Sequence, residues 1–211
     1  TIPLDPQKNS SGKMHKKYFA KYNKQKRTFE ALSELIQETA DEIRYLESVS
    51  NSLDIALNEA DLGQIKEELT ASGYVRRKFT KKKVKLTNKP MHYISSDGYD
   101  IYVGKNNIQN DELTFSFANG GDWWFHAKGA PGSHVIVKTN GDELPDRTFE
   151  EAGRLAAYYS KNHGSDKVEI DYIEKKHVKK PNGAKPGFVV YYTNYSLVID
   201  SDISNIKVVQ D

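Results

Sequence analysis

The chain contains 211 residues, of which 37% are apolar and 28% charged, with a formal net charge of +2. This length can bury one sizeable core, but the mean hydropathy of −0.73 favours a smaller core beside an extended element. The absence of cysteine excludes disulfide scaffolds, thiol catalysis and thiolate metal sites. No apolar run approaches the roughly 18 residues of a membrane span, so we expect no membrane insertion.

Residues 1–73 are predicted to be mainly helical. Between Tyr18 and Ala60, apolar residues recur at alternating spacings of four and three, and only Gln25, Thr39 and Ser50 interrupt the series. A 3.5-residue repeat of this length indicates a coiled-coil helix, a rod of roughly 60–70 Å that needs a partner. The alternative is a helical hairpin that folds back near residues 48–52, where helix propensity is low.

Charge is distributed unevenly along this predicted helix. Lysine and arginine dominate residues 13–27, whereas acidic residues dominate 30–68, an order that opposes the helix dipole. The basic end could be compensated by an antiparallel acidic helix outside this chain or by an anionic partner such as RNA. A solvated charged face is the simpler alternative.

Two local patterns precede a change of period. Asp61 is predicted to cap a short helix that ends near Gly73. Residues 74–90 then contain eight lysines and arginines and no acid, which suits a basic linker that meets phosphates or one that is merely solvated.

After Pro90 the apolar period becomes two, which predicts a separate domain over residues 91–211. We expect an α+β fold with a mainly antiparallel sheet. Short helices are predicted near 109–113, capped by Asn110 or Asp111, and at 152–160, capped by Thr148. The predicted strands cover residues 92–94, 99–103, 168–172, 188–193 paired with 196–200, and 203–209, with others inside 122–137.

Residues 122–137 contain both tryptophans, two of the six histidines and a Pro-Gly turn, and are predicted to form two strands joined by a tight loop. On a strand Trp123 shares one face with Phe125, and Trp124 shares the other with His126, so one of these faces should be packed. The pattern does not decide which.

Catalytic and metal-binding chemistry are poorly supported. His126, His134 and Asp122 could supply three metal ligands, but no His-x-x-x-His spacing or carboxylate cluster accompanies them. Ser133 lies in no strand–nucleophile–helix elbow. We therefore predict no catalytic residue, no metal and no cofactor, and do not expect an enzyme.

RNA binding accounts for more of these residue types. Aromatic rings can stack on bases, lysines can contact phosphates, and glycine turns let the backbone approach a phosphate closely. The two asparagines after the strand at 99–103 could recognise a ligand or close an Asx turn. The predicted RNA-binding residues are Arg76, Arg77, Asn106, Asn107, Trp124, His126, Lys128, Ser133, His134, Lys175, Lys176, His177, Lys179, Lys180 and Lys185.

Several ordered motifs resemble one known family. Residues 101–107, 109–111, 122–128, 131–136, 177–181 and 183–187 closely resemble the NFACT-R domain, which ends the bacterial RqcH proteins, also named fibronectin-binding protein A, and their eukaryotic relative NEMF. The likeness covers roughly residues 90–200. Residues 22–24 and 45–47 resemble the coiled-coil middle region of the same family.

This resemblance implies a fragment from the C-terminal half of a ribosome quality control factor. Family members bind the large ribosomal subunit and tRNA and support C-terminal alanine tailing of stalled nascent chains, which would place the protein in the cytoplasm. The missing N-terminal half is then the implied partner, and the fragment alone is not expected to perform tailing. The alternative is an adhesin module on the bacterial cell surface that binds host fibronectin or fibrinogen, since streptococcal members carry that description.

Overall fold

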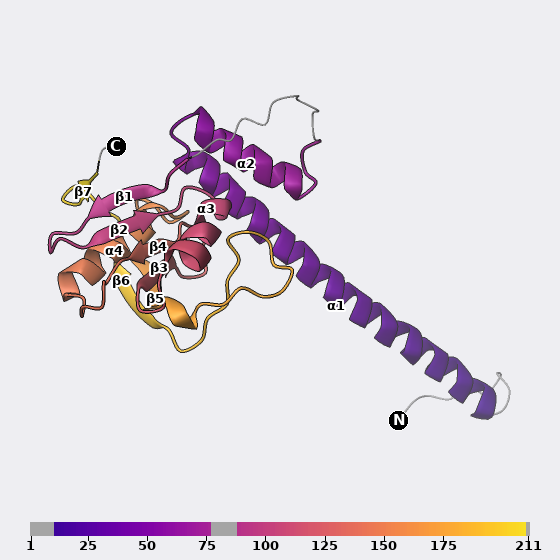
Figure 1. Cartoon of the computed structure of the whole chain (residues 1–211). Helices are drawn as coiled ribbons and strands as arrows, with labels where there is room; N and C mark the ends of the chain where they lie inside the picture. The colour runs from indigo at the N-terminus through magenta and orange to yellow at the C-terminus, as the bar shows by residue number, and fades with distance from the viewer. Residues whose placement is uncertain (1–10, 77–87, 210–211) are drawn as a thin grey trace. The chain divides into compact units, whose positions relative to one another are not determined.

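The computed structural model describes residues 11–76 and 88–209, with side chains from Met14 onward. The chain divides into two compact units, Thr1–Arg44 and Tyr45–Asp211, which we treat separately. Its elements, drawn in Figure 1, are α1 (Ser11–Ile55), α2 (Glu59–Ala71), β1 (Met91–Ile94), β2 (Asp100–Val103), α3 (Asn107–Glu112), the π-helix η1 (Leu113–Phe117), β3 (Trp123–Ala127), β4 (Val135–Val137), α4 (Asp146–Tyr158), β5 (Val168–Glu174), the 3₁₀ helix η2 (Lys175–His177), β6 (Tyr195–Ile199) and β7 (Lys207–Val208).

The first unit is the N-terminal part of α1, and its apolar seam is open. Phe29 is 72% exposed and Ile36 68% exposed, and the neighbouring seam residues are also exposed. A single helix cannot bury its own apolar stripe. The predicted need for a partner along this seam therefore stands.

The predicted long helix is confirmed, and the alternative of a hairpin near residues 48–52 is wrong. α1 continues through this serine-rich stretch to Ile55, although the apolar repeat runs on to Ala60. The Ser48 hydroxyl donates to the Tyr45 carbonyl, and the Ser52 hydroxyl donates to the Ser48 carbonyl. These bonds let serine side chains remain inside the helix despite their low propensity.

The second unit begins with the last turns of α1 packed on α2. Tyr45, Val49 and Ile65 form a small buried cluster between the two helices. Asn58 caps α2 by accepting a hydrogen bond from the Asp61 N–H at 3.0 Å, so the prediction of Asp61 as the cap is wrong. Asp61 already lies in the first helical turn.

The described residues of the second unit contain a seven-stranded sheet in the order β6-β5-β3-β4-β2-β1-β7. Every neighbouring pair is antiparallel. This arrangement, with α4 and α3–η1 beside it, confirms the predicted α+β class (Figure 1).

Both faces of the sheet are covered. On one face Phe125 and Ile101 pack with Leu155 of α4, and Trp123 is half-buried against the same cluster. On the other face Trp124 and Ile136 pack with Leu113 of η1 and with Val178 and other residues of the loop before β6. The central strands are therefore apolar on both sides, and the expectation that one face is packed holds for both.

Two predicted helix caps are wrong. α3 starts at Asn107 with Asn106 as its cap, earlier than expected, because the Asn106 side chain accepts from the Gln109 N–H at 3.0 Å. α4 starts at Asp146, directly after Pro145, where φ is already fixed near the value a helix start needs. Thr148 lies inside the helix and donates its hydroxyl to Asp97 at 2.8 Å.

The end of the chain also differs from the predicted pairing. β6 pairs with β5, and residues 188–193 form no strand beyond a single bridge between Lys179 and Val190. Tyr191 is drawn inward instead, because its hydroxyl donates to Asp171 of β5 at 2.9 Å. The last strand, β7, is short and pairs with β1.

None of the helices within residues 11–76 and 88–209 combines the length and apolar character that crossing a membrane requires.

Candidate nucleic-acid interface

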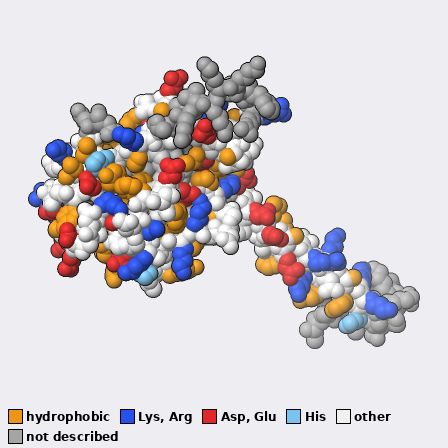
Figure 2. All heavy atoms as spheres, in the orientation of Figure 1, with side chains coloured by type: hydrophobic (Ala, Val, Ile, Leu, Met, Phe, Trp, Pro, Cys, Tyr) orange, Lys and Arg blue, Asp and Glu red, His pale blue; other side chains and the backbone are white. Residues whose placement is uncertain are grey.

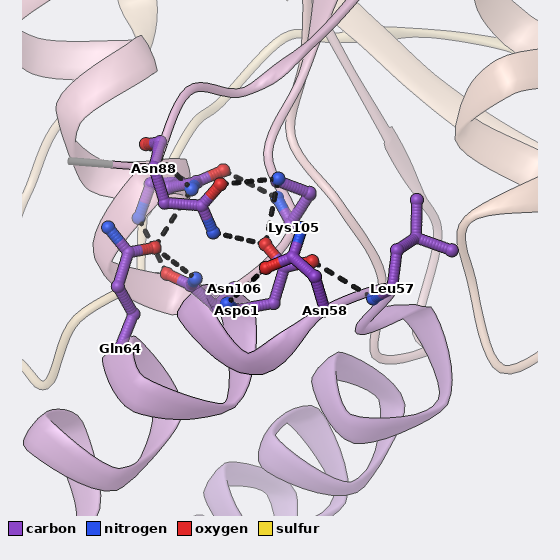
Figure 3. A network of polar contacts seen from close by, with 8 residues as sticks. Leu57, Asn58, Asp61, Gln64, Asn88, Lys105 and Asn106 are labelled. Carbon is purple, nitrogen blue, oxygen red and sulfur yellow. Dashed lines mark hydrogen bonds and ion pairs between the residues drawn. The ribbon is translucent and has the colours of Figure 1, made fainter. Parts of the chain in front are cut away.

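Residues 105–107 form a buried polar junction with the end of α1 and with α2, and Figure 3 shows the part of it around Lys105 and Asn106. Lys105 Nζ lies 2.7 Å from Asp61 Oδ1, and both side chains are almost completely buried. Asn106 donates to Gln64 Oε1 at 2.8 Å. Asn107 donates to Ser48 Oγ and to Glu68 Oε1, each at 2.9 Å. We call these contacts the polar junction, and their chemistry holds the helices to the sheet domain.

Ionisation within the polar junction is strongly shaped by burial. For Asp61, burial alone would raise the pKa, but hydrogen bonds from Lys105, Asn88 and the Leu57 N–H outweigh it and hold the pKa below its ordinary value. For Glu68, burial wins over the bonds from Asn107 and Tyr45, so its pKa is raised. Glu68 Oε2 has no hydrogen-bond partner among the described atoms. Asp61 is thus a well-paired carboxylate, and Glu68 an incompletely paired one.

Asn106 and Asn107, both predicted to meet RNA, therefore have protein partners in this structure. Asn106 is also the cap of α3, so the Asx-type alternative describes its conformation. Gly104 precedes them because a Cβ there would lie 2.2 Å from Asn110 Oδ1. Apart from the partly exposed Tyr102, the residues of the family-like motif at 101–107 are buried packing residues, and the contact of Asn106 and Asn107 with RNA stays an untested prediction.

The aromatic–histidine cluster consists of Trp124, His126 and His134. Trp124 has no exposed surface and His134 is buried, while His126 is half-buried. The ring centroids of the two histidines lie 5.5 Å apart, and each lies less than 6 Å from the Trp124 ring. His134 Nδ1 lies 2.8 Å from the Thr114 hydroxyl. Ser133 is buried beside them, with its N–H donating to the Tyr159 carbonyl at 2.9 Å.

Both imidazoles of this cluster are neutral near pH 7. Burial lowers the pKa of His126 to about 4. Burial, together with the neighbouring His126, holds the pKa of His134 well below its usual range. Neither ring can supply a positive charge to a phosphate at neutral pH, and the Trp124 ring offers no open face for a base.

The described residues contain no group of three His, Cys, Asp or Glu side chains placed to hold a metal ion. Asp122, which the sequence offered as a third ligand, is used elsewhere. Its carboxylate accepts from the N–H groups of Asn119 and Thr139 and pairs with Lys138.

The basic loop, residues 175–187, is the long connection after β5 in Figure 1. Both ends are fixed, because the Lys175 N–H donates to the Asp122 carbonyl at 2.8 Å and the Gly187 N–H donates to Asp111 Oδ1 at 3.0 Å. Within the loop, Lys179 exchanges backbone hydrogen bonds with Val190. Lys180 pairs with the same carboxylate. Lys185 Nζ lies 4.0 Å from the Tyr45 ring centroid, a cation–π contact. These contacts make the loop a fixed surface.

The remaining predicted cations differ in how they are engaged. Lys176 pairs with Glu174, near which His177 also lies, and Lys128 pairs with Glu169 on the surface. Within the described residues no acid lies within ion-pair distance of Lys175 or Lys179. Arg76 is exposed, and Arg77 lies outside the described residues.

Two aromatic residues near the basic loop were missed from the sequence. Phe188 is half exposed, and Tyr192 is 75% exposed. The strand predicted for residues 188–193 assigned alternate side chains to a core and concealed this exposure. In Figure 2, basic and acidic side chains are interspersed on the visible face, so no large single-sign surface appears there.

Comparison with known proteins places these features in context. Residues 1–88 match the NFACT N-terminal and middle domains, and residues 89–193 match the NFACT protein RNA binding domain. The "Rqc2 homolog RqcH" of Streptococcus suis is 43% identical over 207 residues, and that of Bacillus subtilis is 40% identical over 209. Each comparison covers 98% of this chain but 36% of the relative, so the chain spans about a third of their length.

A solved structure is also similar. It is that of the C-terminal part of the fibronectin/fibrinogen-binding protein from Streptococcus suis, with a TM-score of 0.84 and 41% identity. The similarity covers 95% of this chain and 81% of that one.

Proposed function

This chain belongs to the NFACT family, and we propose that its second unit is an RNA-binding module of a ribosome quality control factor. The observation that carries the proposal is the match of residues 89–193 to the family's RNA binding domain. The fixed and exposed basic loop supports it, because lysines held on a rigid surface can meet phosphates with little loss of conformational entropy.

In the finer form of the proposal, the module meets tRNA and large-subunit RNA in the cytoplasm and supports C-terminal alanine tailing by the whole protein. It acts by binding and not as an enzyme. The loop lysines would contact phosphates, and sequence-independent contacts of this kind suit the backbone of a folded RNA. The open seam of α1 would be covered by the rest of the protein.

A titration of tRNA against the chain, at two salt concentrations, tests the proposal. Replacing Lys175, Lys176 and Lys179 by alanine should reduce the slope of log affinity against log salt by roughly 2–3, at about 0.7–0.9 for each lost phosphate contact. A matched control replaces Lys66, Lys167 and Lys207, which are exposed lysines outside the loop. Salt-independent binding by the wild type, or equal effects of the two triple variants, would contradict the proposal.

Adhesion is a second candidate, favoured by the name of the similar streptococcal structure. β6 is a sheet edge and carries Val198, which is largely exposed, so a host segment could add a strand there. Surface plasmon resonance with immobilised fibronectin tests this candidate. Replacing Val198 by proline should abolish such binding, and an absence of binding by the wild type rejects it.

A further inference from the structure

A cleft of about 660 Å³ opens on the second unit, away from the basic loop residues. Residues of β1 and β2 form one wall, and residues of α3 and η1 form the other. This volume lies within the range of about 300–1,000 Å³ that is typical of small-molecule sites. We call it the aromatic cleft, lined among others by Lys89, His92, Tyr102, Glu112, Leu113 and Phe117.

Three rings in the aromatic cleft are held in a fixed arrangement. His92 and Tyr102 are cross-strand partners, stacked with ring centroids 4.5 Å apart and planes inclined by 5°. Phe117 meets the Tyr102 ring edge-on at 4.7 Å. His92 Nε2 lies 2.7 Å from Asp100 Oδ1, which fixes the outer ring of the stack. A flat ligand would therefore meet a wall that needs no reorganisation.

The π-helix accounts for the placement of Phe117. The Ala118 N–H donates to the Leu113 carbonyl at 2.9 Å, a bond five residues back along the chain. Single π-turns inside or after α-helices are rare and occur frequently at functional sites. Here the turn leaves Leu113 on the buried floor and Phe117 44% exposed at the rim, an arrangement that exposes a ring to a ligand instead of burying it.

The charges around the aromatic cleft favour a base over a phosphate inside it. Glu112 is an exposed carboxylate on its rim and would repel a phosphate, but it can accept hydrogen bonds from the edge of a base. One cation, Lys89, lines the cleft, whereas Lys138, whose Nζ lies 4.9 Å from the Phe117 ring centroid, is already paired with Asp122. Lys89 also belongs to the sequence stretch 74–90, which has eight basic residues and no acid.

We propose that the aromatic cleft binds one unpaired nucleobase of an RNA strand whose phosphates lie outside it. The inference rests on the proposed RNA-binding function and assigns a base-reading site separate from the basic loop. Proteins commonly recognise single-stranded RNA by stacking splayed bases on aromatic rings and bonding their edges. Among the bases, guanine presents two adjacent donors on its pairing edge, the pattern that the carboxylate of Glu112 can accept together.

The test compares two oligonucleotides of equal length by fluorescence anisotropy: a single-stranded guanine-containing RNA and its abasic counterpart. The wild type should prefer the base-bearing strand by about 5-fold to 100-fold. Phe117→Ala and His92→Ala should each remove most of that preference while leaving the salt slope unchanged, because the slope counts phosphate contacts. Thermal unfolding of each variant confirms that the fold is retained.

Tyr195→Ala is the matched control, since Tyr195 is a 60% exposed aromatic residue on β6, at the far edge of the sheet from β1. It should keep the full preference. If both cleft variants prefer the base-bearing strand as strongly as the wild type does, the base site is rejected. An apolar side chain of a protein partner would then be the better occupant of the cleft. If the wild type binds neither strand with salt dependence, the RNA-binding proposal itself fails.

Discussion

The polar junction and the aromatic–histidine cluster differ from the basic loop in one decisive respect. The first two contain most of the residues that sequence reasoning selected for chemistry, yet most of these side chains are buried and packed against other protein groups. The basic loop has an unremarkable composition of lysine, proline and glycine, yet it is exposed and fixed at both ends. In this chain, the residues that suggested a functional site from the sequence mainly stabilise the fold, and the accessible positive charge lies in the basic loop.

The largest expected effect lies at the centre of the buried region. Trp124→Ala should lower the free energy of unfolding by about 3–5 kcal/mol, because it leaves a large cavity in a two-sided core. Trp124→Phe should cost much less, since the indole Nε1 makes no hydrogen bond among the described atoms. Urea unfolding measures both. Tyr192→Ala, at an exposed position beside the basic loop, should change stability by no more than about 0.5 kcal/mol.

If Trp124→Ala lowered the free energy of unfolding no more than Tyr192→Ala does, the assignment of Trp124 to a structural core would be wrong.

The polar junction offers the next effect. Asp61→Asn should destabilise the chain by about 3 kcal/mol near pH 7, because it leaves the buried Lys105 ammonium without its counter-charge. Since the folded-state pKa of Asp61 is depressed, its stabilising contribution is present above the unfolded pKa and is lost as pH falls through the folded value. Urea unfolding of both proteins across this acidic range should show their difference shrinking.

Asp54→Asn makes the same chemical change at an exposed position of α1 and should be nearly neutral. A difference between wild type and Asp61→Asn that stayed constant down to low pH would show that charge is not its cause.

The order of the main elements could be predicted from periodicity. The 3.5-residue repeat revealed α1, and the change to a period of two after Pro90 revealed the sheet, because both patterns record which side chains are buried. The first residues of the helices were harder to predict. Asn58 was overlooked as a cap because the residue three positions after it is Asp61, not the glutamate or glutamine of a capping box. Asn106 does have Gln109 at that spacing, and it was overlooked because the two adjacent asparagines were assigned to a turn or a ligand site.

The candidate site was harder to predict, since burial at a site depends on contacts distant in sequence. Asn107 is paired with Ser48 and Glu68, which lie 59 and 39 residues away along the chain. Nothing local distinguishes such an asparagine from one awaiting a ligand. The aromatic cleft was missed for the same reason, because His92, Tyr102 and Phe117 come from separate elements.

Gly187 lies where the two regions meet, and its replacement tests how far the loop depends on the junction. Its φ of +78° disfavours a side chain, and a Cβ would lie 2.6 Å from Asn107 Oδ1. Gly187→Ala should therefore cost about 1–3 kcal/mol in urea unfolding. It should also weaken tRNA binding without changing the charge, since it displaces the anchored end of the basic loop.

Gly183→Ala is the matched control, because Gly183 has a φ of +76° but no atom within 4 Å of a Cβ. It should lower the free energy of unfolding only through backbone strain, with tRNA affinity preserved. Equal losses of affinity in the two variants would mean that contact with Asn107 does not position the loop.

The smallest expected effect is a gain of stability within the junction. Burial raises the pKa of Glu68 in the folded state, so the folded protein holds its proton to higher pH than the unfolded chain. The free energy of unfolding therefore falls as pH rises from the ordinary glutamate value through the raised one, so the penalty for ionising Glu68 grows over this range. Glu68→Gln keeps the acceptor for Asn107 and removes the charge, so it should stabilise the chain by up to about 1 kcal/mol at pH 7 and by less near pH 4. Glu67→Gln, on the exposed side of α2, should show neither effect in the same urea titrations. A destabilising Glu68→Gln at pH 7 would mean that the Glu68 carboxylate contributes to holding α2 on the sheet domain, and that the junction, like the basic loop, depends on charge.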